Sequence, residues 1–498
     1  MVLEFTTICE ILSVVEKKTQ YLSSRFISLW FSNLTTMSPI VSQFRKTLAS
    51  SKSILPFFYQ IAGRLIECKS SEIINFAVAC VSNHLVICLP AILQLGSAGQ
   101  KVIDKLSLVL GPAELEKMNS MMIAFKFYLS LAMMKVDPPM SISRTRGSVL
   151  IPVSSVSHYT EYVRKIQAGA CTILTSRDHV VLKSIVPTFS IADSGKSLPK
   201  IVKVVDVDGR EYAQIVKGND DLRNDAVLQQ LFQLLGVQTY QVVPISARAG
   251  VAEWVNGTTT LGTFLTQAHL EYNPSELEPD ECKLRMSKTK TKLSTYLEIC
   301  KLFTPCLHYF FYEKFSNPKF FFAAQTAFSN SVAATSLMGF IVGLGDRHPN
   351  NILISEISGE VIHIDYGICF DAGTFLKVPE IVPFRLTRDM VDALGVLGTQ
   401  GPFAKTCEDV LLSLKSQSEL VISIVEVFVV DPLFNWAVSS LKSDNAVEAL
   451  NGVKRKLQGF MEINGLPLTP RAQIDRLIRG ATDEECLALM FPGWQAWL

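Results

Sequence analysis

The spacing of apolar residues changes along the chain and predicts two regions of different secondary structure. Over residues 1–180, apolar side chains recur at helical spacing in stretches such as Glu114–Met134, with few strand signals. From about residue 181 the pattern becomes short β-rich runs separated by turn residues. The sequence therefore predicts an N-terminal helical scaffold and a domain boundary between Pro152 and Leu182.

A small mixed lobe is predicted to follow this boundary. Its extended runs are rich in β-branched residues, and Asp208-Gly209 between two of them favours a hairpin turn. A segment with helical spacing then ends at Gly236. The predicted order is strand, strand, helix, strand, strand, over residues 199–207, 211–217, 220–235, 241–246 and 250–255.

Longer helical patterns over residues 294–315 and 320–343 predict a second, mainly helical lobe. The apolar runs Ile73–Leu95 and Phe320–Gly345 are long enough to be mistaken for membrane spans. Both contain polar residues, such as Asn83 and Gln325, that are costly in hydrocarbon without partners, so we expect buried helices.

Composition narrows the class of protein. The net charge of +1 gives no electrostatic reason to expect nucleic-acid or acidic-membrane binding by the chain as a whole. Eleven cysteines without a CxxC pair are typical of reduced thiols in the cytosol or nucleus. The first residues lack a basic region before their apolar stretch and a cleavage site, so we expect no secretory signal.

The strongest chemical signal is the run GLGDRHPNNILI at residues 343–354, followed by VIHIDYG at 361–367. Phosphoryl transfer needs a carboxylate to receive the proton of the attacking hydroxyl, and oxygen ligands for a metal on the phosphates. Asp346, Asn351 and Asp365 supply these groups, at the spacing of a protein-kinase catalytic loop and metal-binding Asp-x-Gly.

Two predicted strands flank a Ser358-Gly359 turn, and strict alternation would send His363 and Asp365 to one face that lines the cleft. The non-functional alternative is a surface ion pair of Asp346 with Arg347 and an ordinary turn at Asp365. It does not explain why Asp346, Asn351 and Asp365 occur together at this spacing.

Lys217 ends its predicted strand on the same face as Ala213 and Ile215, so its ammonium should point to the cleft side. Asp220 and Asp225 follow at the start of the next helix and are expected to pair with it. The alternative is an exposed lysine at a strand end.

The segment Phe189–Ser197 resembles the end of a Walker A loop only in Gly195-Lys196-Ser197. Ser190 stands where the first glycine should be, and strands follow rather than a helix, so we exclude a P-loop NTPase. Glu253-Trp254-Val255 ends an extended segment between the lobes and would suit an adenine ring, although a core tryptophan is an equal alternative.

At these residues the chain resembles the phosphatidylinositol 3-kinase-related protein kinases, and within them the ataxia-telangiectasia mutated (ATM) branch. The resemblance covers more than half the chain and ends in the Gly-Trp-x-x-Trp pattern of residues 493–497. The segments that carry it are QIVKGNDDLRNDAVLQQLFQLLG, VVPISARAGVAEWVNGTTTLGTFL, GLGDRHPNNILI, HIDYGICFDAG, VPEIVPFRLTRDMVDALGV and LMFPGWQAWL.

The resemblance implies an α+β fold: a bilobal, protein-kinase-like catalytic domain of the PI3/PI4-kinase type, with an N-terminal helical scaffold and a helical FATC tail. Tyr366 stands where the ATM branch usually has Leu. The implied domains are the end of a FAT-like scaffold at 1–180, a catalytic domain at 181–445 with lobes at about 181–256 and 257–445, a linker or regulatory segment at 446–465, and FATC at 466–498.

The resemblance also assigns roles to residues. Asp346 becomes the catalytic aspartate, His348 stabilises the transferring phosphate, Asn351 and Asp365 ligate Mg²⁺, with Mn²⁺ as an alternative, and 365–387 forms the activation loop. ATP is the substrate nucleotide. The residues implied to bind it are Lys217, which is also implied in catalysis, Asp220, Asp225, Tyr240, Glu253, Trp254, Val255, Leu353 and Ile364.

By the same resemblance, the partners are nuclear DNA-damage proteins with Ser or Thr before Gln, with the cytoplasm as a further location. Family members are usually far longer and carry a helical-repeat arm that recruits DNA-damage sensors. At 498 residues this chain has almost none of that arm, so we expect a fragment or a shortened form.

Two rival functions remain. Phosphoinositide lipid kinases share the Gly-Asp-Arg-His loop, but residues 371–386 contain only Lys377 and Arg385 as cations, too few for a basic box that receives an inositol polyphosphate. The other rival is a catalytically silent scaffold. Intact Lys217, Asp346 and Asp365 argue against it.

Overall fold

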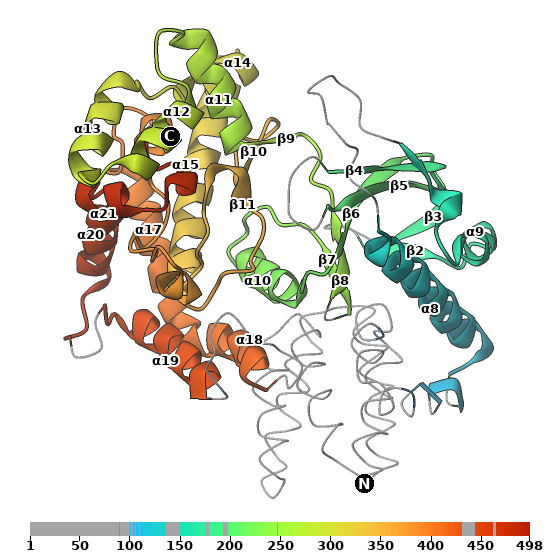
Figure 1. Ribbon diagram of the computed structural model, residues 1–498. Helices are drawn as coiled ribbons and strands as arrows, with labels where there is room; N and C mark the ends of the chain where they lie inside the picture. The colour runs from blue at the N-terminus through green and yellow to red at the C-terminus, as the bar shows by residue number, and fades with distance from the viewer. Residues whose placement is uncertain are drawn as a thin grey trace, which may run out of the picture. The chain divides into compact units, whose positions relative to one another are not determined.

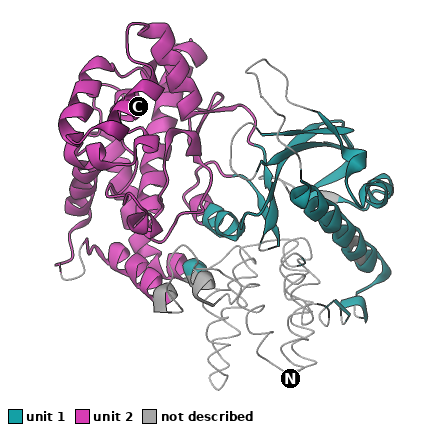
Figure 2. Cartoon of the chain, viewed as in Figure 1, with its two compact units in different colours: residues 1–230, 240–254, 423–435 teal, residues 231–239, 255–422, 436–498 magenta. Residues whose placement is uncertain are grey.

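The structure is a computed structural model with two compact units (Figures 1 and 2). It describes residues 111–135, 150–174, 179–192, 198–246, 248–430, 444–461 and 465–498, with isolated residues between 89 and 110. The first unit comprises residues 1–230, 240–254 and 423–435, and the second comprises 231–239, 255–422 and 436–498. Each unit has its own sheet.

The first unit is built on an antiparallel sheet in the order β1-β4-β5-β6-β8-β7, with β3 also paired to β5 and β2 to β3. The strands span Ile151–Pro152 (β1), Thr172–Leu174 (β2), His179–Ile185 (β3), Thr188–Ile191 (β4), Lys200–Asp206 (β5), Glu211–Gly218 (β6), Val242–Ser246 (β7) and Ala249–Glu253 (β8). Helices α8 (Pro112–Met133), α9 (Tyr159–Gln167) and most of α10 (Arg223–Leu234) complete it.

The β5–β6 hairpin confirms the predicted Asp208-Gly209 turn. Gly209 has φ +83°, a conformation that glycine adopts without strain. The Asp206 carboxylate accepts hydrogen bonds from the backbone N–H groups of Asp208 (2.9 Å) and Arg210 (2.8 Å). The Asp206 side chain therefore fixes this turn, which stabilises the register of β5 against β6.

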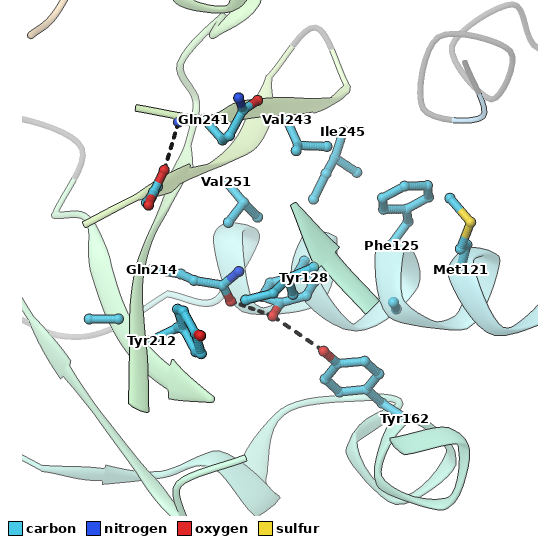
Figure 3. Close-up of a pocket in the computed structure, with 14 residues that line it drawn as sticks. Met121, Phe125, Tyr128, Tyr162, Tyr212, Gln214, Gln241, Val243, Ile245 and Val251 are labelled. Carbon is cyan, nitrogen blue, oxygen red and sulfur yellow. Dashed lines mark hydrogen bonds between the residues drawn. The ribbon is translucent and has the colours of Figure 1, made fainter. Parts of the chain in front are cut away.

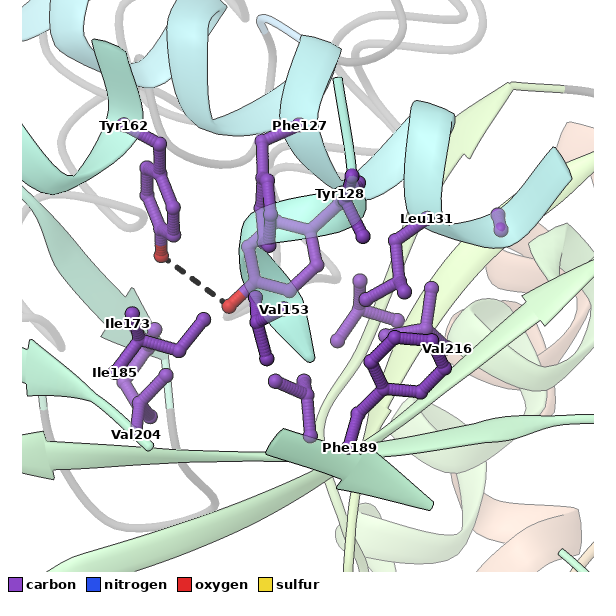
Figure 4. Close-up of a cluster of buried hydrophobic side chains, with 14 of the residues drawn as sticks. Phe127, Tyr128, Leu131, Val153, Tyr162, Ile173, Ile185, Phe189, Val204 and Val216 are labelled. Atoms are coloured by element: carbon purple, nitrogen blue, oxygen red, sulfur yellow. Dashed lines mark hydrogen bonds between the residues drawn. The ribbon is translucent and has the colours of Figure 1, made fainter. Parts of the chain in front are cut away.

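Helix α8 packs against β6, β7 and β8 and buries the core of the first unit (Figure 4). Alternation along β6 sends Gln214 and Val216 into this core and leaves Lys217 on the other face, as predicted. Helix and sheet meet very closely at Gly218, where an added Cβ would lie 2.1 Å from the carbonyl oxygen of Ala132.

A pocket of about 70 Å³ lies between α8 and the sheet (Figure 3). A hydrogen-bonded chain crosses it: the Tyr162 hydroxyl donates to the Tyr128 hydroxyl (3.3 Å), which donates to Gln214 Oε1 (2.5 Å). Burial raises the pKa of Tyr128 above its ordinary value. The chain satisfies polar groups that would otherwise be costly inside the core.

The second unit is mainly helical, with a three-stranded antiparallel sheet in the order β11-β10-β9. The strands are Thr258–Thr260 (β9), Ile352–Ser355 (β10) and Val361–His363 (β11). The helices are α11 (Leu261–Tyr272), α12 (Pro279–Lys288), α13 (Lys292–Leu302), α14 (His308–Lys314), α15 (Pro318–Ile341), α16 (Arg388–Ala393), α17 (Pro402–Ser416), α19 (Asp444–Gln458), α20 (Pro470–Ala481) and α21 (Glu484–Leu489); α18 (Ser418–Val430) contains residues of both units.

Helix α15 confirms the helix predicted over 320–343 and forms the centre of this unit. Its residues from Phe328 to Ile341 are almost all buried, and it packs against α17. No helix among the described residues is long and apolar enough to cross a membrane. The other apolar run, Ile73–Leu95, lies outside the described residues apart from Leu89.

Two predicted elements were wrong. The single helix expected over residues 294–315 is two helices, α13 and α14, because Pro305 removes a backbone donor and cannot sit inside a helix. Strands β1, β2 and the start of β3 lie before residue 181, where the pattern was read as helical. Strands β1 and β2 have only two and three residues, which give too little alternation to detect.

Candidate active site

The candidate site begins at the end of α15, where the backbone turns sharply. Gly343 has φ +60°, and Asp346 has φ +57°, which is uncommon for a residue other than glycine. The Asp346 N–H donates to both carboxylate oxygens of Glu380, at 2.9 Å each. A Cβ on Gly345 would lie 2.6 Å from Glu380 Oε2, so glycine is needed here to let that carboxylate approach.

Arg347 is buried and holds the loop to the end of β11. Its guanidinium donates to the main-chain oxygens of Gly345 and Ile364, at 2.8 Å each, and to that of Asp365. A planar, multiply donating group suits several fixed acceptors at once. Arg347 is therefore part of the frame of the site, and the interpretation as a surface ion pair with Asp346 is wrong.

Asn351 and Asp365, the two predicted metal ligands, are brought together by this frame. The Asn351 side-chain N–H donates to the Asp346 carbonyl oxygen (2.9 Å), and the Ile364 N–H donates to the Asn351 carbonyl oxygen (3.0 Å). The first bond fixes the Asn351 amide, so that its oxygen is directed away from Asp346. An amide oxygen and an exposed carboxylate are the hard ligands that Mg²⁺ prefers.

The predicted shared face of His363 and Asp365 was wrong. Strand β11 ends at His363, and Asp365 has φ +60°, so alternation does not continue to it. His363 is buried, and this burial, together with the Arg347 charge, lowers the pKa of the imidazole to about 3. Asp365 is exposed instead, with its Oδ1 accepting from the Gly367 N–H at 3.3 Å.

His348 is held in one tautomer. Its Nδ1 accepts a hydrogen bond from the Asn350 N–H (3.2 Å), so the proton of a neutral ring lies on Nε2. Burial lowers the pKa of His348, and the nearby Asp346 carboxylate offsets this only in part. The side chain is therefore a neutral donor at Nε2.

The first unit contains the residues predicted to bind the nucleotide phosphates. Lys217 Nζ lies 3.4 Å from Asp220 Oδ2, which confirms the expected pair. Asp225 is buried in the first turn of α10. The predicted phosphate loop, residues 189–197, starts within β4, and its residues 193–197 lie outside the described residues. Strand β5 follows it rather than a helix, in agreement with the exclusion of a P-loop NTPase.

The predicted adenine residues of the first unit are Glu253 and Trp254, at the end of β8, and Tyr240, before β7. Glu253 Oε2 accepts from the Gln241 N–H (3.0 Å), and the Trp254 N–H donates to the Ala213 carbonyl oxygen (3.0 Å), so backbone and side chain are both fixed. The Trp254 side chain is 40% exposed, which argues against a core tryptophan, and Tyr240 is buried.

Three further predicted residues, Val255, Leu353 and Ile364, belong to the second unit. Leu353 is in β10 paired with Ile362, and the Val255 carbonyl oxygen accepts from the Thr258 hydroxyl at 2.8 Å.

Sequence reasoning missed residues that support the site from a distance. Arg385 is buried, and its guanidinium donates to the main-chain oxygens of Trp494 (2.7 Å), Gln495 (3.0 Å) and Leu498 (2.5 Å). It also donates weakly to the Arg347 carbonyl oxygen (3.4 Å) and stacks on the Trp494 ring. The C-terminal tail is thereby joined to the catalytic loop.

A second such link involves Lys456 of α19. Its ammonium contacts both carboxylate oxygens of Asp371 (2.6 and 2.8 Å) and the Phe340 carbonyl oxygen (2.9 Å). Burial lowers the pKa of Lys456, which the Asp371 carboxylate partly offsets. Lys456 and Asp371 line a cleft of about 980 Å³, together with Glu380 and Arg476.

Family models match two parts of the chain. The model described as "Phosphatidylinositol 3- and 4-kinase" matches residues 211–438, and the FATC domain model matches residues 467–498. The second match begins three residues before the first residue of α20, Pro470, and covers α20 and α21.

Curated relatives are named as ATM or Tel1 kinases. "Serine/threonine-protein kinase ATM" of Arabidopsis thaliana is 32% identical over 95% of this chain, and "Serine-protein kinase ATM" of Sus scrofa is 38% identical over 64%. "Serine/threonine-protein kinase tel1" of Aspergillus oryzae is 39% identical over 64%. The chain spans only 12 to 14% of the length of these relatives.

Solved structures give the same result. The structure titled "FAT and kinase domain of CtTel1" superposes with a TM-score of 0.79 at 28% identity, over 96% of this chain and 36% of that one. A second, titled "Complete CtTel1 dimer with C2 symmetry", has the same TM-score and covers 19% of its own chain. The predicted α+β, kinase-like fold with a C-terminal FATC domain is confirmed.

Proposed function

Because the chain belongs to the phosphatidylinositol 3-kinase-related kinases and is related to ATM, we propose that it is an ATP- and Mg²⁺-dependent serine/threonine protein kinase. The observation that carries the proposal is the frame of Arg347 and Glu380, which fixes Asp346, Asn351 and Asp365 through main-chain contacts. Catalysis of phosphoryl transfer is mainly positioning and charge stabilisation, and such a frame provides positioning.

Each group then has one task. Asp346 orients the substrate hydroxyl and receives its proton as the oxygen attacks the terminal phosphorus of ATP, and the bond from that phosphorus to the bridging oxygen breaks to release ADP. Neutral His348 donates from Nε2 to a phosphate oxygen of the group in transfer. Asn351 and Asp365 would hold Mg²⁺, or Mn²⁺ as an alternative, which would neutralise charge on the phosphates.

The nucleotide contacts of the first unit are proposed from its fixed residues. Lys217, which is paired with Asp220, contacts the ATP phosphates. Asp225 contributes negative charge in the first turn of α10. In this unit, Tyr240, Glu253 and Trp254 are the proposed adenine contacts, while Val255, Leu353 and Ile364 of the second unit stay a prediction.

The choice of protein over lipid as substrate rests on Arg385. The residues 371–386 contain two cations, and Arg385 is 2% exposed and already bonded to main-chain oxygens of the tail. Lys377 is then the one exposed cation of residues 371–386 that an incoming headgroup could contact. One lysine is a poor receptor for several phosphates, which favours a peptide substrate.

The biological setting is proposed from the relatives. We expect Ser/Thr-Gln sites in DNA-damage proteins of the nucleus as substrates. The proposed domain division is a FAT-like end at 1–180, a catalytic domain at 181–445, a linker at 446–465 that contains part of α19, and FATC at 466–498.

Radiolabel transfer from ATP tests the proposal directly. The purified chain is incubated with Mg²⁺ and labelled ATP, with a Ser-Gln peptide, the same peptide with Ala for Gln, or phosphoinositide vesicles. We expect label on the Ser-Gln peptide. Asp346→Asn should lower the rate by a factor of about 10² to 10⁴, the usual contribution of a positioned proton acceptor.

The matched control is Asp409→Asn, an exposed carboxylate on α17 paired with Lys405. It should leave the rate unchanged. Labelling of lipid alone would replace the proposal with the lipid-kinase alternative, and equal rates for Asp346→Asn and the unaltered chain would remove Asp346 from the reaction.

A further inference from the structure

A second group of metal-binding side chains lies in the second unit, apart from the proposed active site. In the part of the chain that the structure describes, His269 of α11, Cys306 before α14 and Asp389 of α16 bring one ligand atom each within 4.8 Å of one another. All three side chains are at least 98% buried. Three distant segments of sequence therefore converge on one enclosed point.

The backbone and a neighbouring carboxylate orient these groups. His269 Nδ1 lies 2.7 Å from Glu276 Oε2, and Glu276 Oε1 accepts from the Thr304 N–H at 2.7 Å. Asp389 Oδ1 accepts from the N–H groups of Cys306 (2.7 Å) and Leu307 (3.2 Å). These contacts use one side of the imidazole and one oxygen of the carboxylate.

The other ring nitrogen of His269, Nε2, faces Cys306 and Asp389 and has no hydrogen-bond partner. This atom is buried and lies 3.7 Å from Asp389 Oδ2, too long for a hydrogen bond. Two ligands of one tetrahedral zinc, each about 2.0–2.1 Å from the ion, lie about 3.3 Å apart. The separation of the two atoms is close to that value.

A nitrogen, a sulfur and a carboxylate oxygen are the ligands that zinc takes in proteins. A histidine ligand usually donates its other ring N–H to a carboxylate, as His269 does here to Glu276. We propose that His269 Nε2, Cys306 Sγ and Asp389 Oδ2 bind one zinc ion that has a structural role. A water molecule would complete the coordination, and the Cys306 thiol would release its proton to solvent on binding.

The competing interpretation is an imidazolium between two carboxylates. Burial lowers the pKa of His269, but Asp389 and Glu276 outweigh this and raise it. That arrangement assigns no task to Cys306, whose thiol pKa is raised by burial and by the Asp389 carboxylate. A bound zinc explains all three side chains, because the ion stabilises the thiolate.

Elemental analysis of the purified full chain, after dialysis into metal-free buffer, provides the first test. We expect one equivalent of zinc, lost in Cys306→Ser and retained in Cys282→Ser, a matched buried cysteine of α12 outside the group. Glu276→Gln leaves the ligands in place and should weaken zinc binding roughly 10- to 100-fold.

Cobalt substitution of the unaltered chain gives a second readout that does not depend on a folded variant. A sulfur-to-cobalt charge-transfer absorption is expected if Cys306 is a ligand. Zinc at background level in the unaltered chain, undiminished zinc in Cys306→Ser, or a cobalt spectrum without the sulfur band would each overturn the proposal. Kinase activity is not the readout, so the test is independent of the proposed function.

Discussion

Two buried arginines, Arg347 and Arg385, bind main-chain oxygens over very different spans of sequence. Arg347 joins a loop to the next strand, with partners 2 and 17 residues away. Arg385 joins the 365–387 segment to the tail, with partners 109 to 113 residues away. The first network lies within residues 345–365, which link two neighbouring sequence motifs. The second shows that the first of these motifs depends on a distant part of the chain.

Arg347→Lys would break the local network and have the largest effect. Lysine keeps the charge but cannot donate to Gly345, Ile364 and Asp365 together, so the catalytic loop should shift against β11. A misplacement of about 1 Å can cost roughly 100-fold, and we expect that loss in kcat/KM. Steady-state kinetics measure it, with Arg285→Lys, an exposed arginine paired with Glu281, as the control.

Arg385→Lys would break the distant network with a smaller effect. Losing one hydrogen bond from a charged donor costs about 2 kcal/mol, so the tail should open about 30-fold more often. Hydrogen exchange at the Trp494 and Leu498 amides should accelerate by that factor. Unchanged exchange would mean that packing of the tail aromatic residues, not Arg385, holds it.

Acid titration would sharpen the comparison of the two arginine networks, because His363 is buried beside the Arg347 network. Its pKa is about 3 in the folded chain and about 6.5 unfolded, so the unfolded state binds the proton first as pH falls. The free energy of unfolding should therefore decline by about 1.4 kcal/mol per pH unit from this group below pH 6.5. Urea unfolding between pH 6.5 and 5 should give a shallower slope for His363→Gln.

Lys456 and Asp371 form the second distant link, and we expect the smallest effect there. The lysine is mostly buried, but the Asp371 side chain is 47% exposed, so solvent screens the pair. A double-mutant cycle with Lys456→Met and Asp371→Asn should give a coupling of about 0.5–1 kcal/mol in urea unfolding. Additive single effects would show that the pair contributes only packing.

The sequence predicted best where partners are close in the chain. The motif at 343–354, the hairpin of β10 and β11 and the Lys217–Asp220 pair depend on residues within about twenty positions, and spacing reports them. The turns at Gly209 and Gly359 were also predicted, and both glycines have positive φ.

Prediction was poorest where a distant partner decides the conformation. Nothing near Glu380 indicates that it accepts from the Asp346 N–H. No spacing near Arg385 indicates its contacts with the tail; only the family resemblance implies that residues 471–498 pack against the activation loop. The left-handed backbone of Asp365 was missed because period-two alternation assumes that the strand continues. The break at Pro305 was present in the sequence and should have divided the helix.

The tail is held through its main chain, which matters for protein engineering. Arg385 contacts the backbone oxygens of Trp494, Gln495 and Leu498, and Leu498 is fully buried. Side-chain identity at Gln495 is thus less constrained than its left-handed conformation, and asparagine or glycine should be accepted there. An affinity tag fused after Leu498 would have to leave from an enclosed position, so purification handles belong elsewhere.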